Sequence, residues 1–246
     1  AQDTSRYGED LYKKRMLPEL LRELCKIDSN FYIRVLYCYP DRMTDELIDT
    51  IASEPKVLKY IDLPLQHASG KLLKRMNRHG DREVLTELIN KLRTKIPNLT
   101  IRTTFITGFP GETEEDFTEL SEFVRDMRFD RMGCFAYSPE EDTPAAEFPD
   151  QIDDEVKKHR RDIIMEQQSE IMAEKCESMI GKTIKVLFEG FDRYAECYYG
   201  RSSADAPEVD GKVFFTVEGK KPAVGDIIDV KITDYIDVDL IGEYKA

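Results

Sequence analysis

The spacing of apolar residues changes once along the chain, and this change constrains the fold more than any other feature. In the first two thirds, short apolar runs alternate with long helical stretches. From about Met179 onward, apolar and polar residues alternate at every second position, and glycines separate the segments. Strands that alternate with long helices form parallel sheets, whereas closely spaced short strands form sandwiches or barrels. We therefore expect two different domains.

The first part is expected to form a parallel sheet with helical crossovers. The apolar runs that predict its strands are 31–37, 57–63, 100–106 and 131–137. Helical spacing of the apolar residues predicts helices over 17–27, 45–52, 70–76, 82–95, 113–127 and 153–179. This alternation fits either an open doubly wound sheet or a barrel, and it does not choose between them.

The last part is expected to form a small, OB-like barrel of five short strands. The segments with a period of two are 183–188, 195–199, 212–217, 227–232 and 235–241. Gly181 is placed to end the preceding helix. We therefore predict an α/β domain over residues 1–178 and an all-β domain over residues 179–246.

Charge and cysteine usage exclude several classes of function. The chain carries 36 basic and 49 acidic residues, a net charge of −13, whereas a duplex DNA binder needs basic residues to neutralise phosphates. The charge therefore favours a basic protein partner or a small substrate over nucleic acid. The 5 cysteines form no CxxC and no CxxxCxxC, so their spacing predicts no metal ligands. Without a signal peptide or a membrane-spanning run, we expect a cytoplasmic protein that does not bind membranes.

The most informative stretch, residues 103–117, is typical of a strand, a glycine-bearing turn and a helix. Gly108 and Gly111 would let a ligand approach the backbone, because glycine has no Cβ. Thr113 and Asp116 have the spacing of a capping box, which would direct helix amides toward the turn. Such a turn suits a nucleotide or a carboxylate, although an ordinary βα turn remains equally open.

Polar residues at two strands are further candidates. Gln66 and His67 follow the strand 57–63, and His67 could either hydrogen-bond a ligand or hold the loop. Arg102 alternates with Thr104 along the strand 100–106. If that face points inward, the guanidinium needs a partner, either a ligand carboxylate or a nearby Glu.

These stretches resemble a known family. Residues 105–117 resemble the fifth-strand signature of radical S-adenosylmethionine (SAM) enzymes, specifically the methylthiotransferases. Residues 63–69, 76–78 and 200–201 are similar to the same family, and the last part resembles its TRAM domain. The resemblance covers essentially the whole chain. It implies a partial, open, TIM-like radical SAM barrel followed by a small TRAM barrel.

Within this family, residues 1–8, 10–12 and 205–211 resemble the branch that modifies an aspartate of ribosomal small-subunit protein twelve. The alternatives are the branch that modifies tRNA, or a module that only docks the substrate. The charge favours the first branch, because an RNA-reading barrel should be basic, whereas acidic residues here far outnumber Lys231 between Asp226 and Glu243. The expected docking residues for the basic substrate are Asp226, Asp237 and Asp239.

The resemblance implies SAM and two [4Fe–4S] clusters in the full-length enzyme. The family holds one cluster through CxxxCxxC and the second through three cysteines of an N-terminal domain, and no cysteine here matches. We therefore expect the chain to begin just after the cluster loop and to be inactive alone. In the implied chemistry, a 5′-deoxyadenosyl radical removes a hydrogen from the aspartate β-carbon before sulfur and a methyl group are added.

The same resemblance implies that SAM lies against the strand ends and the signature turn. The residues expected to line it are Gln2, Asp3, Gln66, His67, Arg102, Thr104, Ile106, Gly108, Phe109, Pro110, Gly111 and Glu112. Among the strand and turn residues, Phe105, Ile106 and Phe109 would bracket adenine. Arg102 would bind the methionine carboxylate or the ribose. No catalytic residue is assigned.

Overall fold

The computed structural model describes residues 3–245. The chain divides into two compact units, one up to Gln168 and the other from Ser169 onward. This division falls inside the long helix α7 (Asp154–Glu177), whereas the sequence placed the domain boundary after it. The assignment of domains to residues 1–178 and 179–246 therefore stays a prediction.

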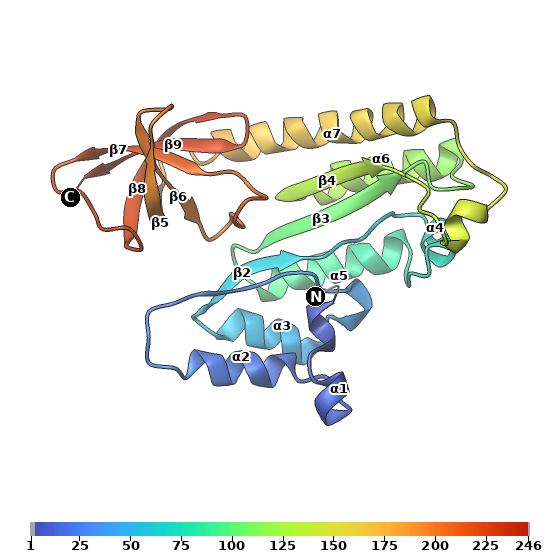
Figure 1. The fold of residues 1–246 in the computed structure, drawn as a ribbon, viewed down its shortest axis with the longest axis horizontal. Coiled ribbons are helices and arrows are strands. Elements are labelled where there is room, and N and C mark those ends of the chain that lie inside the picture. The colour runs from blue at the N-terminus through green and yellow to red at the C-terminus, as the bar shows by residue number, and fades with distance from the viewer. Residues whose placement is uncertain (1–2, 246) are drawn as a thin grey trace. The chain divides into compact units, whose positions relative to one another are not determined.

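A parallel four-stranded sheet organises the first unit (Figure 1). Its strands, which lie in sequence order, are β1 (Ile33–Val35), β2 (Val57–Asp62), β3 (Thr100–Thr107) and β4 (Arg131–Ala136). A doubly wound sheet reverses its strand order at a switch point, whereas a barrel adds each strand beside the last. The order β1-β2-β3-β4 therefore confirms the predicted open barrel rather than the doubly wound alternative.

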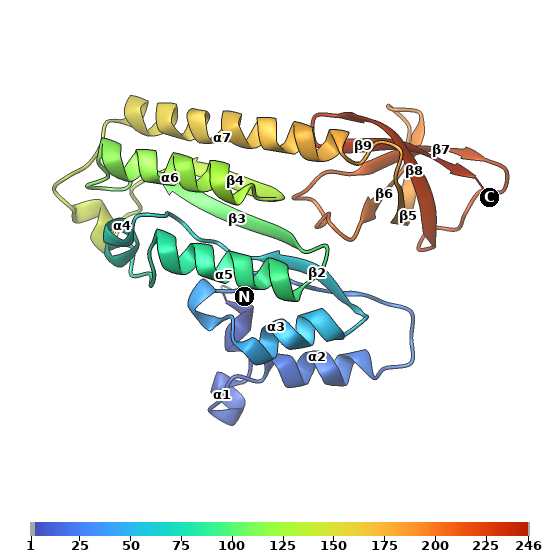
Figure 2. The same ribbon diagram turned by 180° about the vertical axis from the view of Figure 1, so that it is seen from behind.

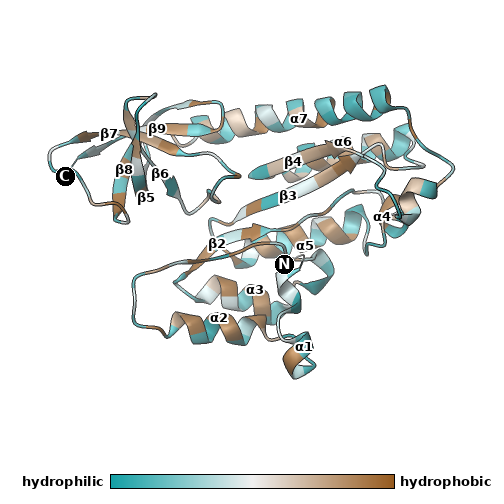
Figure 3. Ribbon diagram, in the orientation of Figure 1, coloured by the Kyte–Doolittle hydropathy of each residue, from teal (hydrophilic) through white to brown (hydrophobic). Residues whose placement is uncertain are grey.

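The main helices of this unit lie on one face of the sheet, as the front and back views show (Figures 1 and 2). The helices are α1 (Glu9–Tyr12), α2 (Leu17–Cys25), α3 (Asp45–Ser53), α4 (Gly70–Arg75), α5 (Arg82–Lys95), α6 (Glu114–Met127) and the first part of α7. Short 3-10 turns are η1 (Thr4–Arg6), η2 (Pro40–Arg42) and η3 (Pro144–Glu147). Figure 3 shows hydrophobic and hydrophilic residues alternating along α3, α5 and α6, as expected for helices with one buried side.

Strand β3 shows where the core lies. Its side chains alternate between buried positions and half-buried positions, so the strand has one covered face and one open face. On the covered face, the Phe105 ring packs edge-on against Phe129 at 5.6 Å and Phe123 at 6.2 Å between ring centroids. The core therefore fills the space between sheet and helices, and the opposite face of the sheet is open.

Local signals place the helix starts. The Thr113 hydroxyl accepts the Asp116 N–H, and the Asp116 carboxylate accepts the Thr113 N–H, so the predicted capping box at the start of α6 is confirmed.

The first strand is shorter than predicted. Tyr37 leaves the sheet with a φ of +58°, and its N–H donates to the Asp62 carboxylate at 3.1 Å.

The second unit is a closed five-stranded barrel. Its order around the barrel is β5 (Thr183–Asp192), β6 (Cys197–Ser202), β7 (Val213–Glu218), β9 (Asp239–Lys245) and β8 (Ile227–Ile236). Antiparallel pairing of β5 with β8 closes the barrel, and β7 runs parallel to β9, as in an OB-like topology. Phe188 and Phe215 fill the interior with Val230, and Met172 of α7 belongs to the same cluster.

The turn between the last two strands lies later than the sequence indicated. The predicted break after Ile232 is a register irregularity between Ile232 and Asp234 inside β8. The chain turns instead at Asp237, which has a φ of +53°. A single-residue bulge and a turn produce the same interruption of a period-two pattern, so the pattern alone does not separate them.

Within residues 3–245, no helix is both long and apolar enough to cross a membrane.

Candidate functional site

The open face of the sheet presents a ladder of side chains across three strands. The parallel register pairs Asp62 with Arg102, Ile106 with Phe135, and Thr104 with Gly133. Because side chains alternate along a strand, paired residues point to the same face. The ladder changes from charged at its base to apolar at the carboxyl ends of the strands, where the Phe135 ring is 61% exposed. Phe135 was not predicted as a site residue, because only the register places it beside Ile106.

An ion pair forms the base of the ladder. The Arg102 guanidinium donates to Asp62 Oδ1 at 3.0 Å, and the Asp62 side chain is almost fully buried. The partner expected for Arg102 was a ligand carboxylate or a Glu, and the structure places the neighbouring strand's Asp there. Asp62 Oδ2 also accepts the Tyr37 N–H. One buried carboxylate therefore ties the ends of β1 and β3 together.

Gln66 continues the line of β2 beside β3. Its N–H donates to the Thr104 carbonyl and its carbonyl accepts the Ile106 N–H, both at 2.8 Å. The backbone of Gln66 has a φ of +72°, so the chain bends sharply immediately after this pairing. The structure therefore brings Gln66, Thr104 and Ile106 together at the carboxyl edge of the sheet, and their contact with SAM stays a prediction.

His67 is buried and faces away from solvent. Its Nδ1 accepts the Ser69 N–H at 3.0 Å, so the neutral ring carries its proton on Nε2. That Nε2 lies 3.3 Å from Glu112 Oε2, outside good hydrogen-bond geometry. Of the two interpretations of His67, the geometry favours holding the loop over contacting a ligand.

Glu112 is the centre of a buried network. Its Oε2 accepts the Gly108 N–H at 2.9 Å, and its Oε1 accepts from Arg160 Nη1 at 2.8 Å. The Glu112 side chain is fully buried, and Arg160 is nearly so. A buried carboxylate is stable only when it is paired and hydrogen-bonded, and this one has both kinds of partner. Sequence reasoning missed Arg160, because it lies far away in the chain on α7.

Three backbone N–H groups of the turn 108–112 donate hydrogen bonds to acceptors within the protein. Besides the Gly108 N–H, the Gly111 N–H donates to the Asp150 carbonyl and the Glu112 N–H donates to the Phe109 carbonyl, each at 2.9 Å. These three amides are therefore engaged within the protein, and the lining of SAM by the turn residues 108–112 stays a prediction.

Both signature glycines have a positive φ, and close packing against the α7 backbone adds a second constraint at Gly108. Gly108 has a φ of +71°, and a Cβ there would lie 2.7 Å from the Lys157 Cβ and closer still to its Cγ. Gly111 has a φ of +82°, and a Cβ there would lie 2.6 Å from Arg75 Nη1. The residues pressed against these glycines belong to the protein itself rather than to a ligand.

Neither aromatic ring of the predicted adenine bracket lines the open face. Phe105 is enclosed in the core, so it does not line the open face. Phe109 is buried edge-on against Tyr137, with ring centroids 5.2 Å apart, and Pro110 beside it is also buried. Of the three residues, Ile106 alone reaches the open face, where Phe135 is its neighbour.

Asp3, which was expected at the site, is engaged within the protein. Asp3 forms an ion pair with Arg42 and accepts the Ser5 N–H, so its carboxylate is engaged. Gln2, which was also expected at the site, lies outside the described residues.

The acidic residues of the second unit are spread apart. Asp226 precedes β8 and accepts the Ala223 N–H, whereas Asp237 follows the same strand. At about 3.3 Å per residue, a ten-residue strand separates them by roughly 30 Å. Asp239 accepts the Lys212 N–H at 2.7 Å. Two of the three predicted docking residues therefore have a local structural role, and Asp226 is not brought together with the other two.

The described cysteines form no metal centre. No group of three or more His, Cys, Asp or Glu within residues 3–245 is placed to hold a metal ion. Burial raises the pKa of Cys38 to about 12, and burial also raises the pKa of Cys134 to about 12. Both thiols therefore stay protonated at neutral pH.

Comparisons with known proteins agree with this architecture. Residues 7–124 match the Radical SAM superfamily and residues 180–244 match the TRAM domain. The chain is 50% identical over 242 residues to "Ribosomal protein uS12 methylthiotransferase RimO" of Lachnoclostridium phytofermentans, covering 98% of this chain and 55% of that protein. It is 51% identical over 244 residues to the protein of the same name from Caldanaerobacter subterraneus, with 99% and 55% covered.

Among solved structures, coproporphyrinogen III oxidase (HemN) from Escherichia coli aligns with a TM-score of 0.48 and 19% identity, over 64% of this chain and 36% of that one. The chain spans about 55% of the length of the two curated relatives. Two domain matches, together with half-identical relatives along nearly the whole chain, lead to one conclusion. The chain carries a Radical SAM domain followed by a TRAM domain, and along nearly its whole length it is similar to the radical SAM methylthiotransferases.

Proposed function

We propose that this chain forms one wall of the SAM site and the TRAM domain of a methylthiotransferase that modifies an aspartate of ribosomal protein uS12. The observation that carries the proposal is the roughly 50% identity, along 98% of the chain, to relatives that bear this name. The tRNA-modifying alternative lacks such support, and the net charge of −13 disfavours it. The proposed setting is the cytoplasm, where the ribosome is modified.

The residues on the open face suit SAM in their chemistry. The exposed Phe135 ring beside Ile106 offers a flat apolar surface for adenine. Gly133, two residues earlier in β4, has no side chain and leaves space beside Thr104. Thr104 supplies a hydroxyl for the ribose at the next position. We include Gln66 in the site because its backbone lies against Thr104 and Ile106. When bound beside a reduced iron–sulfur cluster, SAM supplies the radical that abstracts a hydrogen, and a second SAM supplies the methyl group.

The chain's own residues position this surface. The Arg102–Asp62 ion pair joins β2 to β3. Because Arg102 Nη1 donates to Asp62, a contact of Arg102 with SAM would use other N–H groups of the guanidinium. Hydrogen bonds of Glu112 with the Gly108 N–H and with Arg160 support the turn 108–112, and His67 packs beside Glu112. We assign no catalytic residue to this chain. In our proposal, both [4Fe–4S] clusters are held by ligands other than the five cysteines of this sequence.

The substrate side of the proposal concerns the TRAM domain. Residues 179–246 carry acidic residues in excess, and Asp226 and Asp237 are exposed at opposite ends of β8. A basic protein such as a ribosomal protein would be attracted by this charge. Because the acidic residues are dispersed, we propose electrostatic guidance over a broad surface rather than a single acidic pocket.

The test exchanges this chain for the matching part of a relative. The 244 matched residues of the Caldanaerobacter subterraneus protein are replaced by this chain, and the chimera is reconstituted with iron and sulfide. Purified uS12, SAM and a reductant are added, and the mass of uS12 is measured. The proposal predicts that uS12 gains one methylthio group at an aspartate.

Two controls make this result interpretable. The unmodified relative must methylthiolate uS12, and the 246-residue chain alone is expected to leave uS12 unchanged. A chimera that binds its clusters and cleaves SAM, yet modifies tRNA and not uS12, would overturn the proposal.

A further inference from the structure

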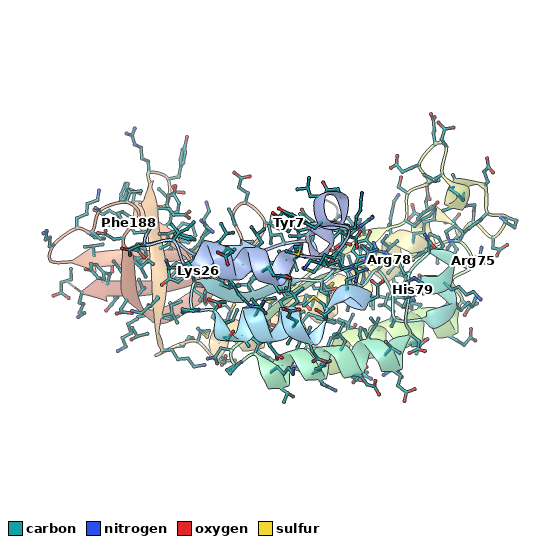
Figure 4. The ribbon with its side chains drawn as sticks, turned by 90° about the horizontal axis from the view of Figure 1, so that it is seen from below. Tyr7, Lys26, Arg75, Arg78, His79 and Phe188 are labelled. Atoms are coloured by element: carbon teal, nitrogen blue, oxygen red, sulfur yellow. The ribbon has the colours of Figure 1, made fainter. Side chains whose placement is uncertain are left out.

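A separate cavity opens at the carboxyl ends of β1 and β2. Its volume is about 340 Å³, and it lies between the residues 39–42, the loop after β2 and the turn 76–79 that follows α4. Figure 4 shows Arg75, Arg78 and His79 at the same end of the first unit. This edge of a parallel sheet is where barrel enzymes bind their ligands. The cavity shares none of its lining residues with the ladder on the open face.

Arg78 is the unusual residue in this cavity. Its guanidinium lies over the Tyr39 ring, 4.2 Å from the ring centroid. Its Nη1 is buried and has no hydrogen-bond partner. Within residues 3–245, no carboxylate lies within ion-pair distance of Arg78. Leaving a charged donor buried and unsatisfied costs free energy, so a group that binds it recovers that cost.

The neighbouring arginines show the contrast. Arg42 lies over the same Tyr39 ring at 5.0 Å, but it forms an ion pair with Asp3. Arg75, one turn earlier in the chain, forms an ion pair with Asp150 at 3.0 Å. Arg78 therefore has the same chemistry as its neighbours without the carboxylate that each of them has.

The cavity walls favour a carboxylate as the ligand. An arginine fork binds a planar carboxylate through two parallel hydrogen bonds, and the Tyr39 ring holds the fork flat. Asn77 and His79 also line the cavity and offer further donors. Asp41 is the acidic residue of the lining, and it lies beside Arg42, 4.0 Å from that guanidinium.

We propose that this cavity binds a carboxylate on Arg78, and that in the methylthiotransferase this group is the side chain of the substrate aspartate. The volume is at the lower end of the range for small-ligand sites and suits one aspartyl residue. The identity of the carboxylate rests on the proposed function, whereas the carboxylate site itself does not.

The test is a titration of the full 246-residue chain followed by heteronuclear NMR. The ligands are an aspartate blocked at both ends, the equally blocked asparagine, SAM and inorganic phosphate. We expect saturable shifts of the Arg78 Nε–H signal and of the 76–79 amides with blocked aspartate, and none with blocked asparagine. Arg78→Gln should weaken the binding by about tenfold or more, because a charge-assisted pair is lost.

Matched variants separate charge from geometry. Arg78→Lys keeps the positive charge but removes the fork, so binding should fall between the unmodified chain and Arg78→Gln. Lys74→Gln removes one exposed positive charge from the same segment and should leave the affinity unchanged. If Arg78→Gln disturbs amide signals throughout the first unit, the affinity for blocked aspartate is compared between Arg78→Lys and the unmodified chain instead.

Each outcome decides the proposal. Absence of saturable shifts with blocked aspartate, or equal affinity in Arg78→Gln, overturns the carboxylate site, as does tighter binding of phosphate. Competition between SAM and blocked aspartate would keep the site but reassign it to the methionine carboxylate. If the chimera fails to modify uS12 while blocked aspartate still binds, the proposed function fails and the site stands.

Discussion

Replacing Gly108 with alanine tests the claim that the signature turn is packed against the protein itself. The backbone at Gly108 has a φ of +71°, and a Cβ there would lie 2.7 Å from the Lys157 Cβ and 3.1 Å from its Cα. The Cα belongs to the backbone of α7, so rotation of the lysine side chain cannot relieve the whole clash. Either α7 or the turn must therefore move.

The expected loss of stability has two parts. A left-handed backbone conformation costs about 1–2 kcal/mol for a residue with a Cβ. Overpacking costs about 1–3 kcal/mol more. Gly108→Ala should therefore lower the free energy of unfolding of the first unit by about 2–5 kcal/mol.

Urea unfolding followed by circular dichroism and by the near-ultraviolet signal of the tyrosines measures this loss. Gly80→Ala is the matched control in the same unit, because Gly80 has a φ of +105° but a Cβ there would have no neighbour closer than 3.6 Å. The control carries the conformational cost without the clash. If Gly108→Ala is no more destabilising than Gly80→Ala, the packing argument is refuted.

Three further predictions follow from the ionisable groups. Arg102→Ala should lower the free energy of unfolding by about 3 kcal/mol, because it leaves the Asp62 carboxylate buried without its ion pair. In a protein that already carries Asp62→Asn, the same substitution should cost much less. A double-mutant cycle measures the difference. Burial raises the pKa of Asp116, but hydrogen bonds from Lys71 and from residues of two loops outweigh it and lower the pKa to about 2. Since this folded pKa is below the unfolded value of 3.8, the stabilisation is present above about pH 4, on the order of 2 kcal/mol, and is lost as the pH falls toward 2. Acid unfolding of Asp116→Asn should lack this part of the pH dependence. Finally, mass spectrometry after brief iodoacetamide treatment at pH 8 should find Cys197 alkylated before Cys38, since the Cys38 pKa is raised to about 12; equal rates would contradict its burial.

The sequence predicted the elements of the fold well, because each rests on local physics. The capping box at Thr113 and the buried runs of the sheet follow from short-range pattern and were confirmed. The bulge between Ile232 and Asp234 was mistaken for a turn, because both interrupt a period of two in the same way.

The site was less predictable, because it depends on register and on contacts between distant residues. Arg102 was singled out from the sequence, but its partner Asp62 is set by the pairing of β2 with β3. Phe135 is placed beside Ile106 by the pairing of β3 with β4. The role of Glu112 depends on Arg160, 48 residues away in the chain. A single sequence carries no direct signal for such pairs.

The affinity of the reconstituted chimera for SAM, measured with and without the Phe135 ring, tests whether the open face is the SAM site. If the open face binds adenine, Phe135→Ala should weaken SAM binding about fivefold, because a stacked ring contributes about 1 kcal/mol. Phe191→Ala removes a comparably exposed ring from the second unit and should leave the affinity unchanged. Equal affinities in both variants and the unmodified chimera would contradict the assignment of the open face as the SAM site.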